Sequence, residues 1–117
     1  MLRARSQTVG PWESFGLCPY GAYYLIFPLH EPAGRIPWVA TEKDYTGDDY
    51  GMLRARSEAI GTWEQFTITW HGSGPDYITI KARANDRYVT TERNWTGSRF
   101  GMLRARSTTA GPWERFQ

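Results

Sequence analysis

Two segments of similar sequence carry side chains that could recognise a ligand. Thr41–Tyr50 reads TEKDYTGDDY and Thr91–Phe100 reads TERNWTGSRF. Each segment gathers a carboxylate, an Asp or Asn, an aromatic residue, a Thr and a Gly within six residues. Acidic and amide oxygens accept hydrogen bonds from neighbouring hydroxyls, an aromatic ring packs on an apolar face, and Gly permits close approach. This combination is typical of a shallow site for a monosaccharide.

The two segments therefore predict two equivalent loop sites. Binding residues usually lie on loops that a rigid scaffold positions. An alternative interpretation stays open at this point: each segment is a polar hairpin whose aromatic residue packs locally. The predicted ligand-binding residues are Glu42, Asp44, Tyr45, Thr46 and Asp48 in the first segment, and Glu92, Asn94, Trp95, Thr96 and Arg99 in the second.

The residues that could catalyse a reaction form no recognisable pattern. His30 and His71 occupy non-equivalent positions, and the chain has neither a Cys/His spacing for a metal nor a Gly-rich phosphate loop. Glu42 and Glu92 occupy equivalent places in two repeated units. Such places lie apart around a pseudo-symmetric fold, whereas glycoside hydrolysis needs two carboxyl groups about 5–10 Å apart. We expect a binding protein that is not an enzyme and uses no cofactor or metal.

The elements that must position these residues are repeats. MLRARSQTVGPWESF at Met1–Phe15 returns as MLRARSEAIGTWEQF at Met52–Phe66 and as MLRARSTTAGPWERF at Met102–Phe116. Ten of the fifteen positions are identical in all three copies. Between these blocks, WVATEKDYTGDDYG at Trp38–Gly51 aligns with YVTTERNWTGSRFG at Tyr88–Gly101.

The repeat boundaries predict a single domain over residues 1–117. It consists of a half repeat at 1–15 and two full repeats at 16–66 and 67–117. The chain therefore holds about two and a third units, and the half repeat contains no copy of the predicted loop site.

Each full unit predicts about four short strands, because apolar and polar residues alternate between clusters of turn residues. Six Trp, seven Tyr, 12 Gly and seven Pro also disfavour long helices. The first expected strand is the apolar run, at Ala22–Leu29 in one unit and Tyr77–Ala82 in the other. The second is Trp38–Glu42 and its copy Tyr88–Glu92. The third is MLRARS, and the fourth begins at W-E-x-F and continues as in Gln65–Thr69.

Two motifs common to all three copies each have two interpretations. In W-E-x-F, the Trp and Phe fill a shared core, or the Trp is a platform for a sugar. The first is favoured because the motif is intact in the half repeat. Its Glu points outward or accepts N–H groups from the preceding Gly-containing turn. The Arg residues of MLRARS have two interpretations: a solvated face, with side-chain stems that cover apolar surface, or a site that binds an anion or sugar hydroxyls. A structural pairing of these Arg residues with the Glu of W-E-x-F also stays open.

The order Y-V-x-T-E, L-R-A-R, G-P-W-E-x-F resembles the fascin-like trefoil repeat of actinobacterial carbohydrate-binding modules. The repeated W-E-x-F in a small, Arg-rich chain is also similar to a family of Streptomyces hemagglutinins that bind L-rhamnose and galactose-type sugars. The resemblance covers nearly the whole chain. It implies an all-β, β-trefoil fold of the fascin-like or ricin-B-like type, with the first lobe incomplete.

The resemblance implies a secreted lectin, a hemagglutinin that binds mono- or oligosaccharides on cell-surface glycans. One alternative is a structural or protein-binding fascin-like trefoil, or a hydrolase inhibitor. Another is a detached carbohydrate-binding module of a polysaccharide-degrading enzyme. The repeated loop with an aromatic and an acidic residue favours the lectin, since a filament binder has no need to duplicate it.

Composition limits the partners. The net charge is +2, with 14 basic and 12 acidic residues, which is too balanced to predict nucleic-acid binding. No apolar run approaches the length that spans a membrane, so we expect no membrane insertion. An incomplete trefoil would leave strand edges unpaired and a core face uncovered. Three explanations are compatible with the incomplete repeat: a reduced trefoil, a homodimer in which two chains complete each other, or loss of upstream residues. We expect a homodimer.

Overall fold

The computed structural model describes residues 2, 15–29, 37–72, 76–94 and 101–116. In this part of the chain the regular structure is a sheet of eight antiparallel strands with three short 3-10 turns. The strands are β1 (Phe15–Tyr20), β2 (Tyr23–Pro28), β3 (Trp38–Glu42), β4 (Met52–Ser57), β5 (Phe66–His71), β6 (Tyr77–Ala82), β7 (Arg87–Thr91) and β8 (Leu103–Ser107). The all-β prediction is confirmed.

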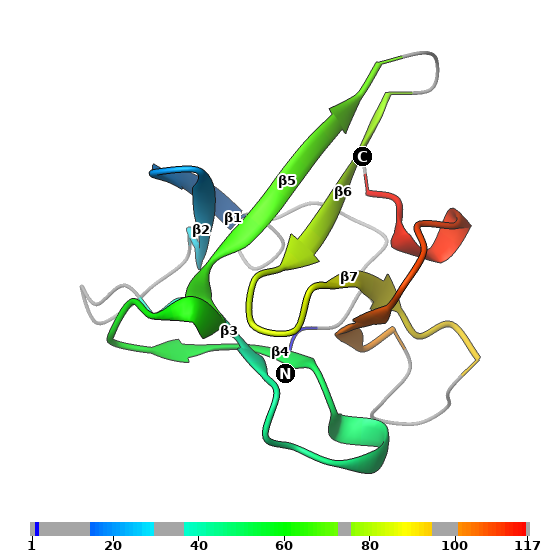
Figure 1. The fold of residues 1–117 in the computed structure, drawn as a ribbon, viewed down its shortest axis with the longest axis horizontal. Coiled ribbons are helices and arrows are strands. Elements are labelled where there is room, and N and C mark those ends of the chain that lie inside the picture. Colours follow the sequence, from blue (N-terminus) through cyan, green and yellow to red (C-terminus); the bar gives the residue numbers. More distant parts are fainter. Residues whose placement is uncertain (1, 3–14, 30–36, 73–75, 95–100, 117) are drawn as a thin grey trace.

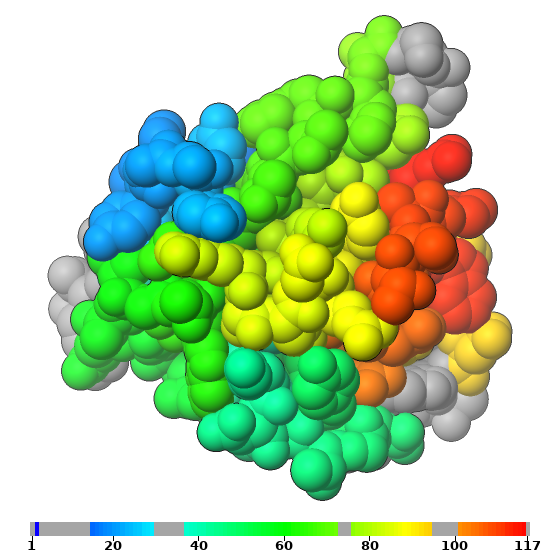
Figure 2. Space-filling model, in the orientation of Figure 1, coloured from blue at the N-terminus to red at the C-terminus, as the bar shows by residue number. Residues whose placement is uncertain are grey.

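The sheet is built from four antiparallel pairs of consecutive strands, in the order β1-β2-β5-β6-β7-β8-β4-β3. The sheet curls, so that β3 packs near β2 although no ladder joins them (Figure 1). The hairpin of β5 and β6 extends away from the body, while the loop between β3 and β4 lies at the opposite end (Figures 1 and 2).

The strands follow the sequence repeat. β1 to β4 form one set, and β5 to β8 repeat it. β1 begins at Phe15 and β5 begins at Phe66, the equivalent residue of the motif. The apolar run at Ala22–Leu29 predicts β2, but Gly16 and Pro19 obscure the strand pattern of β1.

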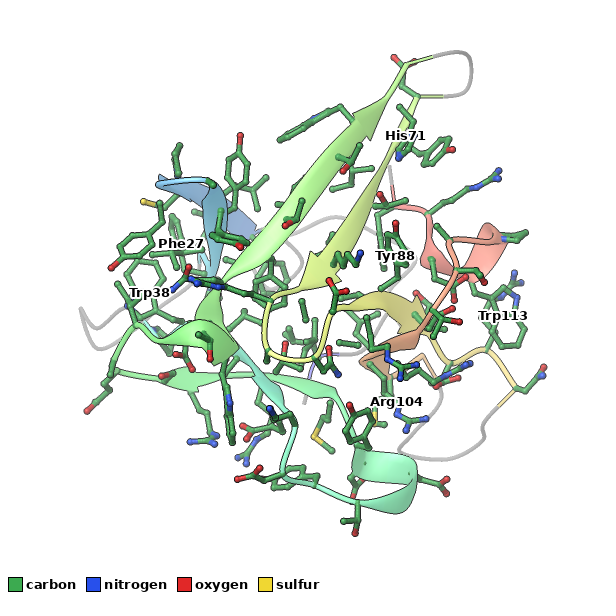
Figure 3. All side chains as sticks on the ribbon, in the orientation of Figure 1. Phe27, Trp38, His71, Tyr88, Arg104 and Trp113 are labelled. Carbon is green, nitrogen blue, oxygen red and sulfur yellow. The ribbon has the colours of Figure 1, made fainter. Side chains whose placement is uncertain are left out.

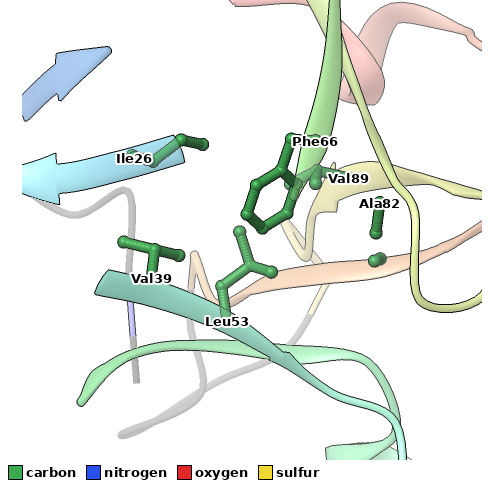
Figure 4. Packing of buried hydrophobic residues seen from close by; sticks show 7 residues of the cluster. Ile26, Val39, Leu53, Phe66, Ala82 and Val89 are labelled. Atoms are coloured by element: carbon green, nitrogen blue, oxygen red, sulfur yellow. The ribbon is translucent and has the colours of Figure 1, made fainter. Parts of the chain in front are cut away.

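The core lies inside the curl and uses equivalent positions of both sets (Figure 4). Val39 on β3 and Val89 on β7 are fully buried, as is Phe66 at the start of β5. Phe116 is partly buried against the same cluster. The remaining members are Ile26, Leu53, Ala82 and Ala105.

Leu2, in the first copy of MLRARS, is hydrogen-bonded to the equivalent leucines of the other two copies. Its N–H donates to the carbonyl of Leu53 (2.8 Å), and its carbonyl accepts from the N–H of Leu103 (2.9 Å). These three leucines are the same position of the repeat. One residue of the half repeat therefore lies between the other two copies and packs against the core.

The Trp-Glu pair of W-E-x-F forms a 3-10 turn (Thr62–Glu64, Pro112–Glu114) rather than the start of a strand. The expectation of a continuous bent strand is wrong at this point. Glu64 Oε1 accepts from the N–H of Gly61 (2.7 Å), and Glu114 Oε1 accepts from that of Gly111 (2.8 Å). These bonds close the turn and confirm the backbone-accepting role predicted for the Glu.

The core interpretation of the motif is confirmed for its described Phe residues in the full repeats, Phe66 and Phe116, whereas Trp63 and Trp113 are only half-buried. Phe15 is 40% exposed. Phe66 pairs with Tyr24 of β2, and Phe116 pairs with Ile78 of β6. The half repeat at 1–15 holds no copy of the segment that contains Tyr24 and Ile78.

Candidate functional site

The first predicted loop, residues 43–51, connects β3 to β4 and closes on one carbonyl. The carbonyl of Glu42 accepts from the N–H of Gly51 (3.1 Å) and, at 3.4 Å, from that of Tyr45. A single 3-10 turn, η2 (Gly47–Asp49), shapes the loop between them. The backbone of the loop is thus tied to the end of β3.

The second loop, after β7, closes in the same way. The carbonyl of Glu92 accepts from the N–H of Gly101 at 3.0 Å. Gly51 and Gly101 have φ of 76° and 73°, which side chains rarely tolerate. A Cβ on Gly51 would also lie 2.4 Å from the carbonyl oxygen of Ala105. Gly is therefore needed where each loop returns to the sheet.

A buried carboxylate lies beneath the first loop. Glu42 is 1% exposed, and both of its oxygens accept from Arg56 on β4, at 2.5 Å from Nε and 2.7 Å from Nη2. This bidentate geometry matches a guanidinium to a carboxylate. The hydrogen bond raises the pKa of Arg56 above its ordinary value, although partial burial opposes the change.

The equivalent carboxylate beneath the second loop has two arginine partners. Glu92 is 3% exposed and accepts from Arg106 at 2.6 and 2.9 Å and from Arg104 at 3.0 Å. Burial alone would raise the pKa of Glu92, but the hydrogen bonds and charges of Arg106 and then Arg104 outweigh it and lower the pKa. Glu92 is therefore ionised at neutral pH.

Arg104 connects the two repeats (Figure 3). Besides Glu92 it donates to the carbonyls of Tyr50 (2.8 Å) and Gly47 (3.1 Å), both in the first loop. Asn85 adds a contact to Tyr50, donating to its hydroxyl at 3.1 Å and to the carbonyl of Ala105 at 2.7 Å. The β8 strand of one repeat thus holds the loop of the other.

Arg54, the repeat equivalent of Arg104, has a different partner. Its Nη1 donates to the hydroxyl of Tyr45 at 2.7 Å. The reason follows from the repeat: Arg104 reaches the loop of the preceding repeat, but the half repeat before Arg54 contains no such loop. Arg54 instead fixes the aromatic ring of the first predicted site.

The predicted site residues divide into two groups. Asp44, Thr46 and Asp48 are exposed and Tyr45 is half-buried in the first loop, and Asn94 is exposed in the second, as shallow sites require. Glu42 and Glu92 instead lie beneath the loops, with oxygens that accept from arginines. Each carboxylate joins the strand that precedes its loop to the strand that follows it. The ligand-binding role predicted for these residues stays a prediction, and Trp95, Thr96 and Arg99 lie outside the described residues.

The sequence interpretation missed the arginines as anchors of the loops. It kept a pairing with the Glu of W-E-x-F open, whereas the structure pairs Arg56 with Glu42 and Arg106 with Glu92. A signal was present in the sequence. Glu42 precedes Arg56 by 14 residues, and Glu92 precedes Arg106 by the same 14 residues. Asn85 belongs to a turn that the repeat does not conserve between units, so no comparable signal identifies it.

Among the residues that the structure describes, no group of three or more His, Cys, Asp or Glu could hold a metal ion. No helix in this described part is long and apolar enough to cross a membrane. A scan against protein-family models finds no match to the chain, and a search of curated proteins finds no relative.

Replacing Glu92 with Gln tests the buried anchor. We expect the free energy of unfolding at pH 7 to fall by about 3 kcal/mol, because two arginines would lose their buried partner. The pKa of Glu92 is lower in the folded state, so its contribution is present above the unfolded pKa and lost as pH falls through the folded pKa. Urea unfolding at pH 7 and about pH 2 should therefore show the two proteins converging in acid.

The matched control is Asp44→Asn, which removes an exposed carboxylate and should change the free energy of unfolding by less than about 0.5 kcal/mol. A Glu92→Gln variant that is as stable as the wild type at pH 7 would contradict the anchoring role.

Proposed function

We propose that this protein is a non-enzymatic carbohydrate-binding lectin with two equivalent sites, on the loops that follow β3 and β7. One observation carries the proposal: both loops close on a Glu carbonyl above a buried carboxylate that arginines hold. A sugar site of this kind needs polar groups that are fixed before the ligand arrives, since ordering them on binding costs affinity.

The first loop supplies the chemistry that a pyranose needs. Asp44, Thr46 and Asp48 are exposed, and the ring of Tyr45 is oriented by Arg54. The oxygens would accept from sugar hydroxyls while the ring packs on the C–H face. The proposed ligands are L-rhamnose or galactose-type sugars on cell-surface glycans, and the proposed location is extracellular; both rest on the resemblance of the repeats.

We also propose that the strands belong to a β-trefoil whose first lobe is reduced. The support is the place of Leu2 between Leu53 and Leu103, since equivalent residues of three lobes meet around the axis of a trefoil. The recurring pair of Phe66 with Tyr24 and of Phe116 with Ile78 is the second support.

Replacing Tyr45 and Trp95 with Ala in one chain tests the loop sites. We expect loss of hemagglutination and of binding to a glycan array, with an unchanged circular dichroism spectrum, because the rings that pack on the sugar are removed. Leu29→Ala is the control, since Leu29 is 59% exposed and lies outside β1 and both loops. Full binding by the double variant, or silence of the wild type across the array, would refute the proposal.

A homodimer is the proposed assembly. Leu17 pairs with Ile26 across β1 and β2, so the two side chains share the core face of the sheet. Ile26 is 7% exposed, whereas Leu17 and Phe15 are each 40% exposed. β1 is also a terminal strand of the described sheet. A second copy placed against β1 would cover this apolar face, and the same edge on both chains is compatible with two-fold symmetry.

Light scattering tests the dimer through Leu17→Lys. The wild type should have twice the mass of one chain, and the variant should have the mass of a monomer, because a charge at a buried apolar contact is costly. Leu29→Lys is the matched control, since Leu29 is 59% exposed and lies outside β1. A monomeric wild type would overturn the proposal.

A further inference from the structure

The far end of the β5–β6 hairpin carries a hollow that the loop sites do not explain. Its volume is about 260 Å³. The tip of this hairpin lies at the opposite end of the molecule from the loop between β3 and β4 (Figure 1). The lining residues are Trp70, His71, Gly72, Asp76, Tyr77, Ile78 and Phe116.

A stacked pair of rings braces the hairpin that carries the hollow. The rings of His71 and Tyr77 stack with centroids 4.5 Å apart and 9° between their planes (His71 is labelled in Figure 3). His71 pairs with Tyr77 and Trp70 with Ile78, and neighbouring residues of a strand point to opposite faces, so the stack lies on the face opposite the indole of Trp70. The stack therefore holds the two strands together behind Trp70.

Trp70 borders the same hollow and is 59% exposed. Its ring contacts Tyr24 edge-to-face, with centroids 5.7 Å apart, so its orientation is set by a neighbour in β2. The repeat itself does not call for an aromatic residue here, because Pro19 occupies the equivalent place in β1. The exposed indole, held by Tyr24, offers an apolar face to a ligand in the hollow.

We infer that this hollow binds one pyranose ring, as a third sugar site of a type different from the loop sites. The inference rests on the proposed carbohydrate function for the class of ligand. The C–H face of the sugar packs on the indole of Trp70, and the exposed carboxylate of Asp76 accepts from a hydroxyl at the rim.

Size and polarity select this occupant. The hollow is smaller than the range of about 300–1,000 Å³ that is usual for drug-sized ligands, so it fits a single ring better than a longer molecule. The exposed carboxylate of Asp76 disfavours an anion and can accept from a hydroxyl. A ring with one apolar face and a hydroxylated edge fits the indole of Trp70 and this carboxylate.

NMR titration with L-rhamnose and with D-galactose tests the inference. The backbone amide signals of Tyr77 and Ile78 should shift with at least one sugar, in the wild type and in the Tyr45→Ala, Trp95→Ala double variant. Trp70→Ala should weaken the affinity at these signals by about tenfold or more, and Trp70→Phe by less, because a smaller ring remains. Leu29→Ala, with the same exposed fraction as Trp70, should have no effect.

The outcomes separate this site from the loop sites. Shifts at Tyr77 and Ile78 without shifts in residues 43–51 would support the hollow and contradict the loop assignment. Shifts only in residues 43–51 would overturn the hollow and leave the loop sites intact. Absence of any shift with both sugars would overturn both, as would shifts at Tyr77 and Ile78 that persist unchanged in Trp70→Ala.

Discussion

The burial of a carboxylate at the end of β3 and again at the end of β7 is the constraint on which the described structure depends. A buried, ionised carboxylate is costly unless charged donors satisfy it. Arg56 satisfies Glu42, while Arg104 and Arg106 satisfy Glu92. Because these arginines alternate with core residues on β4 and β8, one strand both fills the core and holds a loop. Core packing and loop geometry are therefore coupled in each repeat.

The same constraint explains why the repeats differ. Arg104 is buried between Glu92 and the carbonyls of the first loop, whereas Arg54 donates to the hydroxyl of Tyr45. Phe15 is 40% exposed where Phe66 is buried. Equivalent residues of the repeat thus have different surroundings and different partners.

Sequence repeats predicted the strands and the core better than they predicted the loop anchors. Alternation identified β3, β4 and β6, and the triplicated motif identified Phe66 as core. The 3-10 turn at Trp63 and Glu64 was missed, because W-E-x-F was interpreted as the start of a strand, although its Glu was expected to accept from the Gly-containing turn. The pairing of MLRARS arginines with distant glutamates was also missed, since periodicity gives the face of a residue but not its partner across the sheet.

Amide hydrogen exchange in Arg56→Met tests most directly whether the ion pair of Arg56 with the buried Glu42 holds the first loop. Gly51 donates to the carbonyl of Glu42, and Gly101 makes the equivalent bond to Glu92. The account predicts faster exchange at Gly51 and unchanged exchange at Gly101, with the reverse pattern in Arg106→Met. Unchanged protection at Gly51 in a folded Arg56→Met protein would contradict it.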